Sequence, residues 1–81
     1  MRHDLKIESH FFNDILDGRK TWELRKNDRN FRCGDILDLH EIDDNGEYTG
    51  RECTRTVRYV FNSIIGNCYG LCDGYCIMSI E

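Results

Sequence analysis

The side chains best suited to chemistry lie together in residues 18–32. This segment contains six basic residues and two acidic ones, whereas the other 66 residues contain five basic and 13 acidic ones. The six bases are Arg19, Lys20, Arg25, Lys26, Arg29 and Arg32. Basic residues gathered on a chain with a net charge of −4 indicate a local anionic ligand, such as a phosphate or an RNA backbone.

Four residues of this segment are the candidate site. Glu23 and Arg25 alternate in a predicted strand, which places their side chains on one face together with that of Thr21. Glu23 can then orient the Arg25 guanidinium so that it binds a phosphate or a carboxylate with two donors. Lys20 begins the strand and can meet a phosphate as a point charge. The alternatives are an exposed Glu23–Arg25 pair, worth under about 1 kcal/mol, and a solvated lysine.

Other residues of the chain could widen this site. Arg29 and Arg32 would extend its positive rim, and phosphate contacts would supply most of the affinity. Tyr69 belongs to a glycine-rich loop that could offer a stacking surface beside the basic segment, or could close one end of the fold. Trp22 alternates with Leu24, so we expect it to anchor the core rather than to stack on a base.

The five cysteines raise the question of a metal site. Cys68, Cys72 and Cys76 recur at four-residue spacing, but zinc sites usually begin with closer pairs. Gly70 and Gly74 would also break any helix that brought the three thiols together. An odd number of cysteines favours reduced thiols over a disulfide framework. We therefore expect neither a metal nor a cofactor.

Length and composition limit which classes of protein the chain can belong to. Eighty-one residues make one domain, residues 1–81. No apolar run approaches the roughly 20 residues that span a bilayer, and the first residues lack a hydrophobic signal core, so we expect a cytoplasmic protein with no membrane partner. The acidic balance argues against strong nonspecific binding to duplex nucleic acid, but it leaves room for a pocket or a short single-stranded site.

The first part of the chain predicts a strand and a helix. Leu5 and Ile7 alternate with polar residues, which is typical of a short strand. A helix is expected over residues 9–17, with Ser9 as its cap and Gly18 ending it in a left-handed conformation. Its apolar stripe consists of Phe11, Phe12, Ile15 and Leu16.

The rest of the chain predicts three further strands. They cover residues 36–42, 51–61 and 75–80, and a hairpin turn at residues 43–46 joins the first two. Residues 62–73 are expected to form a loop. A short chain with one helix and five or six strands most simply closes into a barrel, because closure removes the free edges. The predicted fold is therefore mainly β (α+β), a small barrel of five to six strands with one helix near the N-terminus.

Several separate blocks of the sequence resemble the ASCH superfamily. The blocks are residues 18–21, 23–29, 31 and 34–37, with further matches at residues 3–7, 48–52 and 70–75. Within that superfamily the chain is closest to DUF3850, a domain family of unknown function carried by phages and bacteria. The resemblance covers nearly the whole chain and implies a PUA-like β-barrel with one helix across an end.

The resemblance also implies a function. It implies that RNA or a nucleotide binds in a cleft beside the helix, lined by the Gly-x-Lys-Thr segment and the arginine after it. The matching positions in this sequence are Lys20, Thr21, Glu23 and Arg25. One bacterial branch of the superfamily is an amidohydrolase that removes the acetyl group from acetylated cytidine. It uses a lysine that matches Lys20, and a threonine whose place Glu23 takes here.

We therefore expect an RNA- or nucleotide-binding module, without catalysis, built on a basic cleft around the Gly-Arg-Lys-Thr segment. Two alternatives remain open. The first is a small amidohydrolase acting on a modified nucleoside such as acetylated cytidine, with Lys20 as the polarising or basic group and Glu23 as acid or base. The second is a phage-encoded protein-interaction module.

Overall fold

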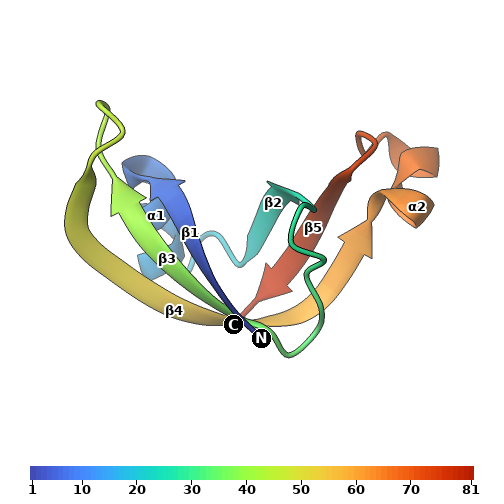
Figure 1. Ribbon diagram of the computed structural model, residues 1–81, viewed down its shortest axis with the longest axis horizontal. Coiled ribbons are helices and arrows are strands. Elements are labelled where there is room, and N and C mark those ends of the chain that lie inside the picture. Colours follow the sequence, from blue (N-terminus) through green and yellow to red (C-terminus); the bar gives the residue numbers. More distant parts are fainter.

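Five strands form one sheet (Figure 1), in the order β1-β3-β4-β5-β2. The structure is a computed structural model that describes residues 1–81. The elements are β1 (Arg2–Glu8), α1 (Ser9–Leu16), β2 (Trp22–Lys26), β3 (Ile36–Ile42), β4 (Tyr48–Asn62), α2 (Ser63–Gly66), the 3₁₀ turn η1 (Asn67–Tyr69) and β5 (Tyr75–Ile80). The fold is therefore mainly β, and each predicted strand is present.

β4 is the longest strand and is shared between two parts of the sheet. Up to Thr56 it pairs antiparallel with β3, and from Val57 it pairs antiparallel with β5. The register shifts between Val57 and Tyr59, which indicates a β-bulge and bends the strand there. As a result β1, β3 and the first part of β4 form one arm of the molecule, and β2, β5 and the last part of β4 form the other (Figure 1).

The sheet is open, which corrects the prediction of a closed barrel. β1 and β2 are its two edges and do not pair with each other. Arginine side chains bond the free edge of β1 instead. Arg25 Nη2 donates to the carbonyl of Lys6 (2.8 Å), and Arg29 Nη1 donates to the carbonyl of Asp4 (2.8 Å). We call this boundary between β1 and β2, bridged by Arg25 and Arg29, the seam.

The hydrophobic core draws side chains from every strand except β2. Its 11 members are Leu5, Ile7, Phe12, Ile15, Phe31, Leu37, Leu39, Val57, Cys76, Met78 and Ile80. On β2 the predicted alternation is present, but its phase is reversed. Glu23 is 3% exposed, whereas Trp22 and Leu24 are 46% and 50% exposed. The expectation that Trp22 anchors the core is therefore wrong, because an ion-paired glutamate takes the inward position.

α1 lies where a helix was expected and packs on the sheet through Phe12 and Ile15, which are buried. Ser9 is not its cap, contrary to the prediction. The Ser9 hydroxyl instead donates to the carbonyl of Ile42 at the end of β3 (3.1 Å), which ties the start of the helix to the sheet. Gly18 has a φ of +78°, the left-handed conformation predicted for it.

Residues 62–73, predicted as a loop, contain α2 and η1. Asn62 caps α2, because its Oδ1 accepts from the N–H of Ile64 (3.1 Å). Gly66 packs so closely that a Cβ there would lie 2.7 Å from the Leu71 side chain. Turns this short leave no helical periodicity in the sequence, so pattern alone misses them. None of the helices has the length and apolarity that a membrane crossing needs.

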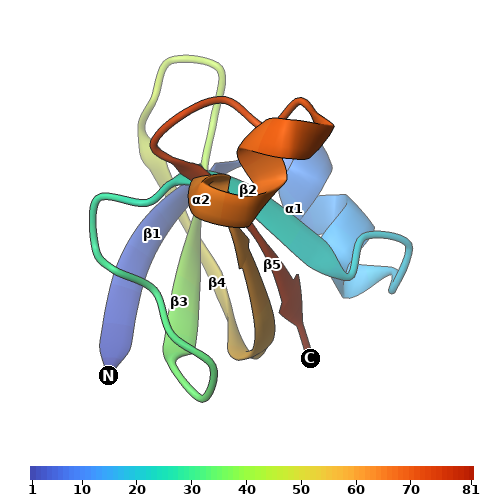
Figure 2. The ribbon, with the colours of Figure 1, turned by 90° about the vertical axis from the view of Figure 1, so that its right-hand side faces the viewer.

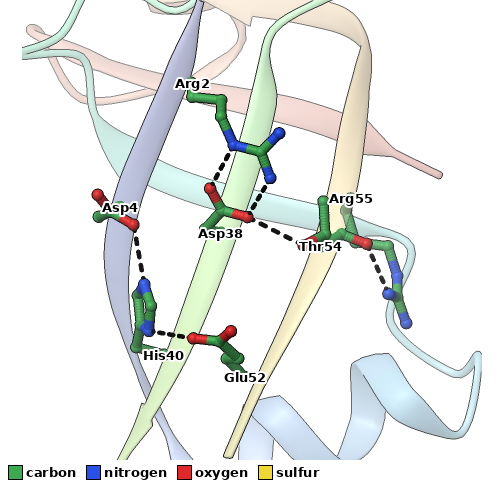
Figure 3. A network of polar contacts seen from close by, with 7 residues as sticks. All are labelled: Arg2, Asp4, Asp38, His40, Glu52, Thr54 and Arg55. Carbon is green, nitrogen blue, oxygen red and sulfur yellow. Dashed lines mark hydrogen bonds and ion pairs between the residues drawn. The ribbon is translucent and has the colours of Figure 1, made fainter.

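Polar side chains join the strands of one arm on its outward face (Figure 3). His40 on β3 bonds Asp4 on β1 through Nε2 (2.9 Å) and Glu52 on β4 through Nδ1 (3.0 Å). Beside it, Asp38 accepts from Arg2 (2.8 Å) and from the Thr54 hydroxyl (2.9 Å). Side chains therefore link these three strands in addition to the backbone ladder.

Candidate functional site

Three of the predicted site residues form a charge cluster on the inward face of β2. Lys20 Nζ donates to Glu23 Oε1, and Arg25 Nε donates to Glu23 Oε2 (2.7 Å). Glu23 is buried, and the side chains of Lys20 and Arg25 are only 10% and 22% exposed. The Glu23–Arg25 pair is thus not an exposed surface pair. We call Lys20, Glu23 and Arg25 the charge cluster.

The local sequence explains how these side chains meet. Gly18, in its left-handed conformation, turns the chain after α1, and the N–H of Lys20 donates to the carbonyl of Asp14 in the helix (3.1 Å). Lys20 therefore enters the cluster from the turn between α1 and β2. Glu23 and Arg25 follow on β2, two residues apart and on the same face.

Two aromatic rings flank the Lys20 ammonium group. Its Nζ lies 4.7 Å from the ring centroid of Trp22 and 5.3 Å from that of Phe11 on α1. Both are cation–π distances. Trp22 therefore contributes to the charge cluster instead of the core.

The seam carries a groove made of two adjacent hollows that share Lys6 and Arg25. The smaller hollow, of about 220 Å³, lies between β1, α1 and β2 and reaches Glu23. The larger, of about 360 Å³, lies between β1 and the connection from β2 to β3, and Arg29 and Tyr48 line it. We call the two together the seam groove. Its lining contains four basic and four acidic residues, so its charge is balanced.

Arg25 is held in the seam groove by two of its three nitrogen atoms. Glu23 binds Nε, and the carbonyl of Lys6 binds Nη2, while Nη1 has no partner in the protein. A guanidinium whose position is already fixed loses little entropy when its remaining N–H groups bind an acceptor. The groove is therefore able to bind a carbonyl or phosphate oxygen at Arg25.

Three other predicted site residues lie outside both the charge cluster and the seam groove. Thr21 is exposed just before β2, and its carbonyl accepts from the N–H of Ile80 (2.9 Å). Arg32 is exposed and lines a different groove, on the other side of the β2–β3 connection. The ring of Tyr69 in η1 lies near that of Phe61 (centroids 6.2 Å apart), and Tyr69 does not line the seam groove.

Lys6 and Phe11 line the groove although neither is predicted as a site residue. The alternation of Leu5 and Ile7 does place Lys6 on the outward side of β1. Its meeting with Arg25, however, depends on which strands form the two edges of the sheet. Spacing along the chain carries no signal for that long-range order.

The cysteines at four-residue spacing have different environments. Cys68 and Cys72 are exposed, whereas Cys76 is in the core, where burial raises the pKa of its thiol. No three side chains of His, Cys, Asp or Glu lie together in a way that would hold a metal ion. The absence of a metal stays a prediction, and elemental analysis of the purified protein tests it. One zinc ion per chain would contradict it.

Comparison with known proteins relates the chain to one family and to two curated relatives. An uncharacterised 12.9 kDa protein in the GpA 3′ region of Escherichia phage P2 is 44% identical over 50 residues, which are 62% of this chain and 45% of the relative. The N(4)-acetylcytidine amidohydrolase of Shigella boydii serotype 4 (strain Sb227) is 34% identical over 55 residues, which are 67% of this chain and 53% of the relative. The matches span about half the length of these relatives. The family model described as "Domain of unknown function (DUF3850)" matches residues 2–80, so the chain belongs to the DUF3850 family.

Proposed function

We propose that the chain is an RNA- or nucleotide-binding module of the ASCH type, and that the seam groove holds the nucleoside part of its ligand. Glu23, Arg25 and Arg29 line the groove and contact the ligand there, and Lys20 and exposed Thr21 contact it from the turn before β2. The module binds its ligand without catalysing a reaction.

The fixed position of Arg25 is the observation that carries this proposal. Its guanidinium is oriented by Glu23 and by the Lys6 carbonyl, and Nη1 is left for a ligand. A nucleobase offers ring nitrogens and carbonyl oxygens as acceptors. The balanced charge of the groove suits such a polar, nearly neutral group better than it suits a row of phosphates, which would meet four carboxylates.

Two further observations support a ligand related to nucleosides. The relative from Shigella boydii is named for a modified nucleoside, N(4)-acetylcytidine. The sequence blocks around Lys20 resemble the ASCH superfamily, to which that type of amidohydrolase belongs. Both observations concern relatives, so the ligand of this chain has to be established by titration.

Titration of the protein with short single-stranded RNA and with nucleoside monophosphates, at two salt concentrations, tests the proposal. Arg25→Ala is expected to weaken binding by about 1.5–3 kcal/mol, the range for a hydrogen bond to a charged group. Arg25→Lys should restore only part of the loss, because a point charge cannot reproduce the planar guanidinium.

A matched control separates the site from general effects of charge. Arg19→Ala removes the same charge from the same basic segment, but Arg19 bonds Asp17 (3.0 Å) and does not line the seam groove. Arg25→Ala is also expected to lower the melting temperature, since it removes a partner of a buried carboxylate. Affinities are therefore compared well below each melting temperature. If Arg25→Ala binds as tightly as Arg19→Ala, the site assignment is wrong.

Amide hydrolysis on a modified nucleoside is a second candidate function, favoured by the amidohydrolase relative and by the Lys20–Glu23 pair, whose glutamate lines the groove. Glu23 would take a proton from the water that attacks the amide carbonyl, and Lys20 would stabilise the oxyanion. The C–N bond would then break, and the nucleobase amine would leave with that proton.

Incubation with N(4)-acetylcytidine, followed by chromatography for cytidine and acetate, distinguishes the two functions. Turnover by the wild type that is lost in Glu23→Gln would replace the noncatalytic proposal. Binding of the nucleoside without any product supports it.

A further inference from the structure

A second groove lies on the other side of the connection between β2 and β3, residues 27–35, which Figure 2 shows as a long irregular loop. It has a volume of about 600 Å³, and Arg32, Arg58 and Tyr59 line it. Buried Phe31 separates it from the seam groove, since it lines both. We call it the outer groove. It has two arginines and no acidic residue in its lining, on a chain whose net charge is −4.

The wall of the outer groove is fixed to the sheet by hydrogen bonds. The N–H of Gly34 donates to the carbonyl of Val57 (2.8 Å), and the N–H of Val57 donates to the carbonyl of Asp35 (2.8 Å). The Cys33 thiol donates to the carbonyl of Arg58 (2.9 Å). The connection is thus bonded to β4 at the bulge, so the groove is present before any ligand binds.

The bulge also exposes two consecutive residues of β4 in this groove. In a regular strand Arg58 and Tyr59 would point to opposite faces, but at the register shift between Val57 and Tyr59 both are exposed and both line this groove. Tyr59 is 63% exposed. The Arg58 guanidinium already donates to the Glu81 carboxylate. That bond uses Nε and leaves Nη1 and Nη2 without a partner in the protein, so the groove offers an open aromatic ring and a guanidinium with free donors.

Two asparagines add hydrogen-bond donors to the lining. Asn27 Oδ1 accepts from the N–H of Phe31 (3.0 Å), and Asn62 Oδ1 accepts from the N–H of Ile64 (3.1 Å). Each amide therefore keeps its NH₂ group for a ligand. With the two arginines, the polar side chains of the groove offer chiefly donors. The matching ligand carries acceptors and negative charge.

We propose that the outer groove binds the phosphate-bearing part of a nucleotide, with the phosphate at Arg32 and Arg58 and a base stacked on Tyr59. A nucleotide combines the required features, an oxyanion and a flat π-face. This inference takes its class of ligand from the proposed function, on which it rests, and deepens that function by placing the phosphate and the base. The ligand is a free nucleoside monophosphate or one unit of a single-stranded RNA that crosses residues 27–35 from the seam groove.

The test uses Arg32→Ala and Tyr59→Ala, with Tyr59→Phe and Arg55→Ala as controls. Arg55 donates to the carbonyl of Thr54 and lines neither groove, so its removal changes the net charge without altering the lining of either groove. The probes are a fluorescent eight-nucleotide single-stranded RNA, followed by anisotropy at two salt concentrations, and adenosine monophosphate, followed by ¹H–¹⁵N spectra. The same spectra are recorded with the RNA.

Arg32→Ala should weaken RNA binding about tenfold and reduce the magnitude of the salt slope by about 0.7, as expected for one lost phosphate contact. Tyr59→Ala should weaken it by about fivefold or more, whereas Tyr59→Phe keeps the stacking ring and should stay within about twofold of the wild type. Amide signals of residues 31–33 and 58–60 should shift. If adenosine monophosphate shifts these signals, a free nucleotide is sufficient as the ligand. If only the RNA shifts them, the ligand is a single-stranded RNA.

The outcomes separate this inference from the proposed function. If signals shift only on β2 and α1, and Arg32→Ala and Tyr59→Ala bind like the wild type, the outer groove is not a site and the seam groove stands. If signals shift at residues 58–60 while Arg25→Ala binds normally, the outer groove stands and the seam groove is wrong. The absence of shifts with both ligands overturns both.

Discussion

Glu41 is a buried carboxylate with several hydrogen-bond donors. Arg51 donates to it through Nε (2.9 Å) and Nη2 (2.8 Å), and the Thr49 hydroxyl donates to the same carboxylate (2.6 Å). These bonds, that from Arg51 first, lower the pKa of Glu41 to about 2. The pKa of Asp35 is also about 2, because hydrogen bonds, beginning with that from His3, outweigh the opposing effect of burial.

The charged form of Glu41 therefore stabilises the fold above its ordinary pKa of 4.5, and this contribution is lost as the pH falls towards 2. We predict that the melting temperature, followed by circular dichroism, falls across this range. Glu41→Gln should melt lower near neutral pH and show a flatter decline in acid. Exposed Glu47→Gln is the control and should follow the wild type. A decline in Glu41→Gln as steep as in the wild type would assign the acid sensitivity to other groups.

At the scale of single residues, the sequence predicts the charge cluster better than it predicts which face of β2 points into the core. Glu23 and Arg25 alternate, and this alone brings them together. The apolar character of Trp22 and Leu24 predicts that their face of the strand points inward, and this prediction is wrong. A glutamate can occupy a buried position when two cations pair with it. One of these cations, Lys20, comes from outside the strand, so its position depends on the turn.

Among the elements, β1, β3 and β4 are linked by His40. Its hydrogen bond to Asp4, followed by the charge of Glu52, raises its pKa above 6.5. A raised pKa means that the protonated ring stabilises the fold fully below pH 6.5, and that this contribution is lost as the pH rises through the folded-state pKa.

We predict that Asp4→Asn lowers the pKa of the His40 ring, measured by NMR titration of its ring protons. His40→Gln should remove the part of the pH dependence of the melting temperature that lies just above pH 6.5. Glu8→Gln, at an exposed position of the same strand, is the control for a change in net charge. An unchanged ring pKa in Asp4→Asn would show that the hydrogen bond to Asp4 contributes little to the pKa of His40 in solution.

The two neighbouring phenylalanines of α1 have different roles. Phe12 is in the core, whereas Phe11 is partly exposed and lines the seam groove. Phe12→Ala should cost about 3–5 kcal/mol of unfolding free energy, as other large-to-small core changes do. Phe11→Ala should cost clearly less and should weaken ligand binding instead. Urea denaturation and RNA titration of both variants measure the difference, and equal stability losses would contradict it.

Element positions were largely predictable, since each strand and α1 has a clear period or turn signal. α2 was not, because a helix of four residues, Ser63–Gly66, is shorter than any window in which its period could appear. Its cap, Asn62, looks the same in the sequence as a turn residue.

At the scale of the whole molecule, side chains instead of backbone hydrogen bonds bridge the two edges of the open sheet. The barrel was predicted because closure removes free edges. Arg25 and Arg29 bond the β1 edge in another way, by donating to its carbonyls. Nothing in the spacing of these arginines indicates that they would face β1. The order of the strands decides it, and β1 and β2 are consecutive in sequence yet lie at opposite edges.

The bend in β4 also has a mechanical consequence. The two walls of the seam groove belong to different arms, β1 and α1 on one side and β2 on the other, and the arms share β4 (Figure 1). The angle between the arms at the bulge between Val57 and Tyr59 therefore sets the width of the groove together with the hydrogen bonds that Arg25 and Arg29 make across the seam. The thickness of ligand that the groove accepts depends in this way on the curvature of one strand. A substitution at buried Val57, which lines neither groove, can therefore change ligand selectivity without altering any atom that touches the ligand.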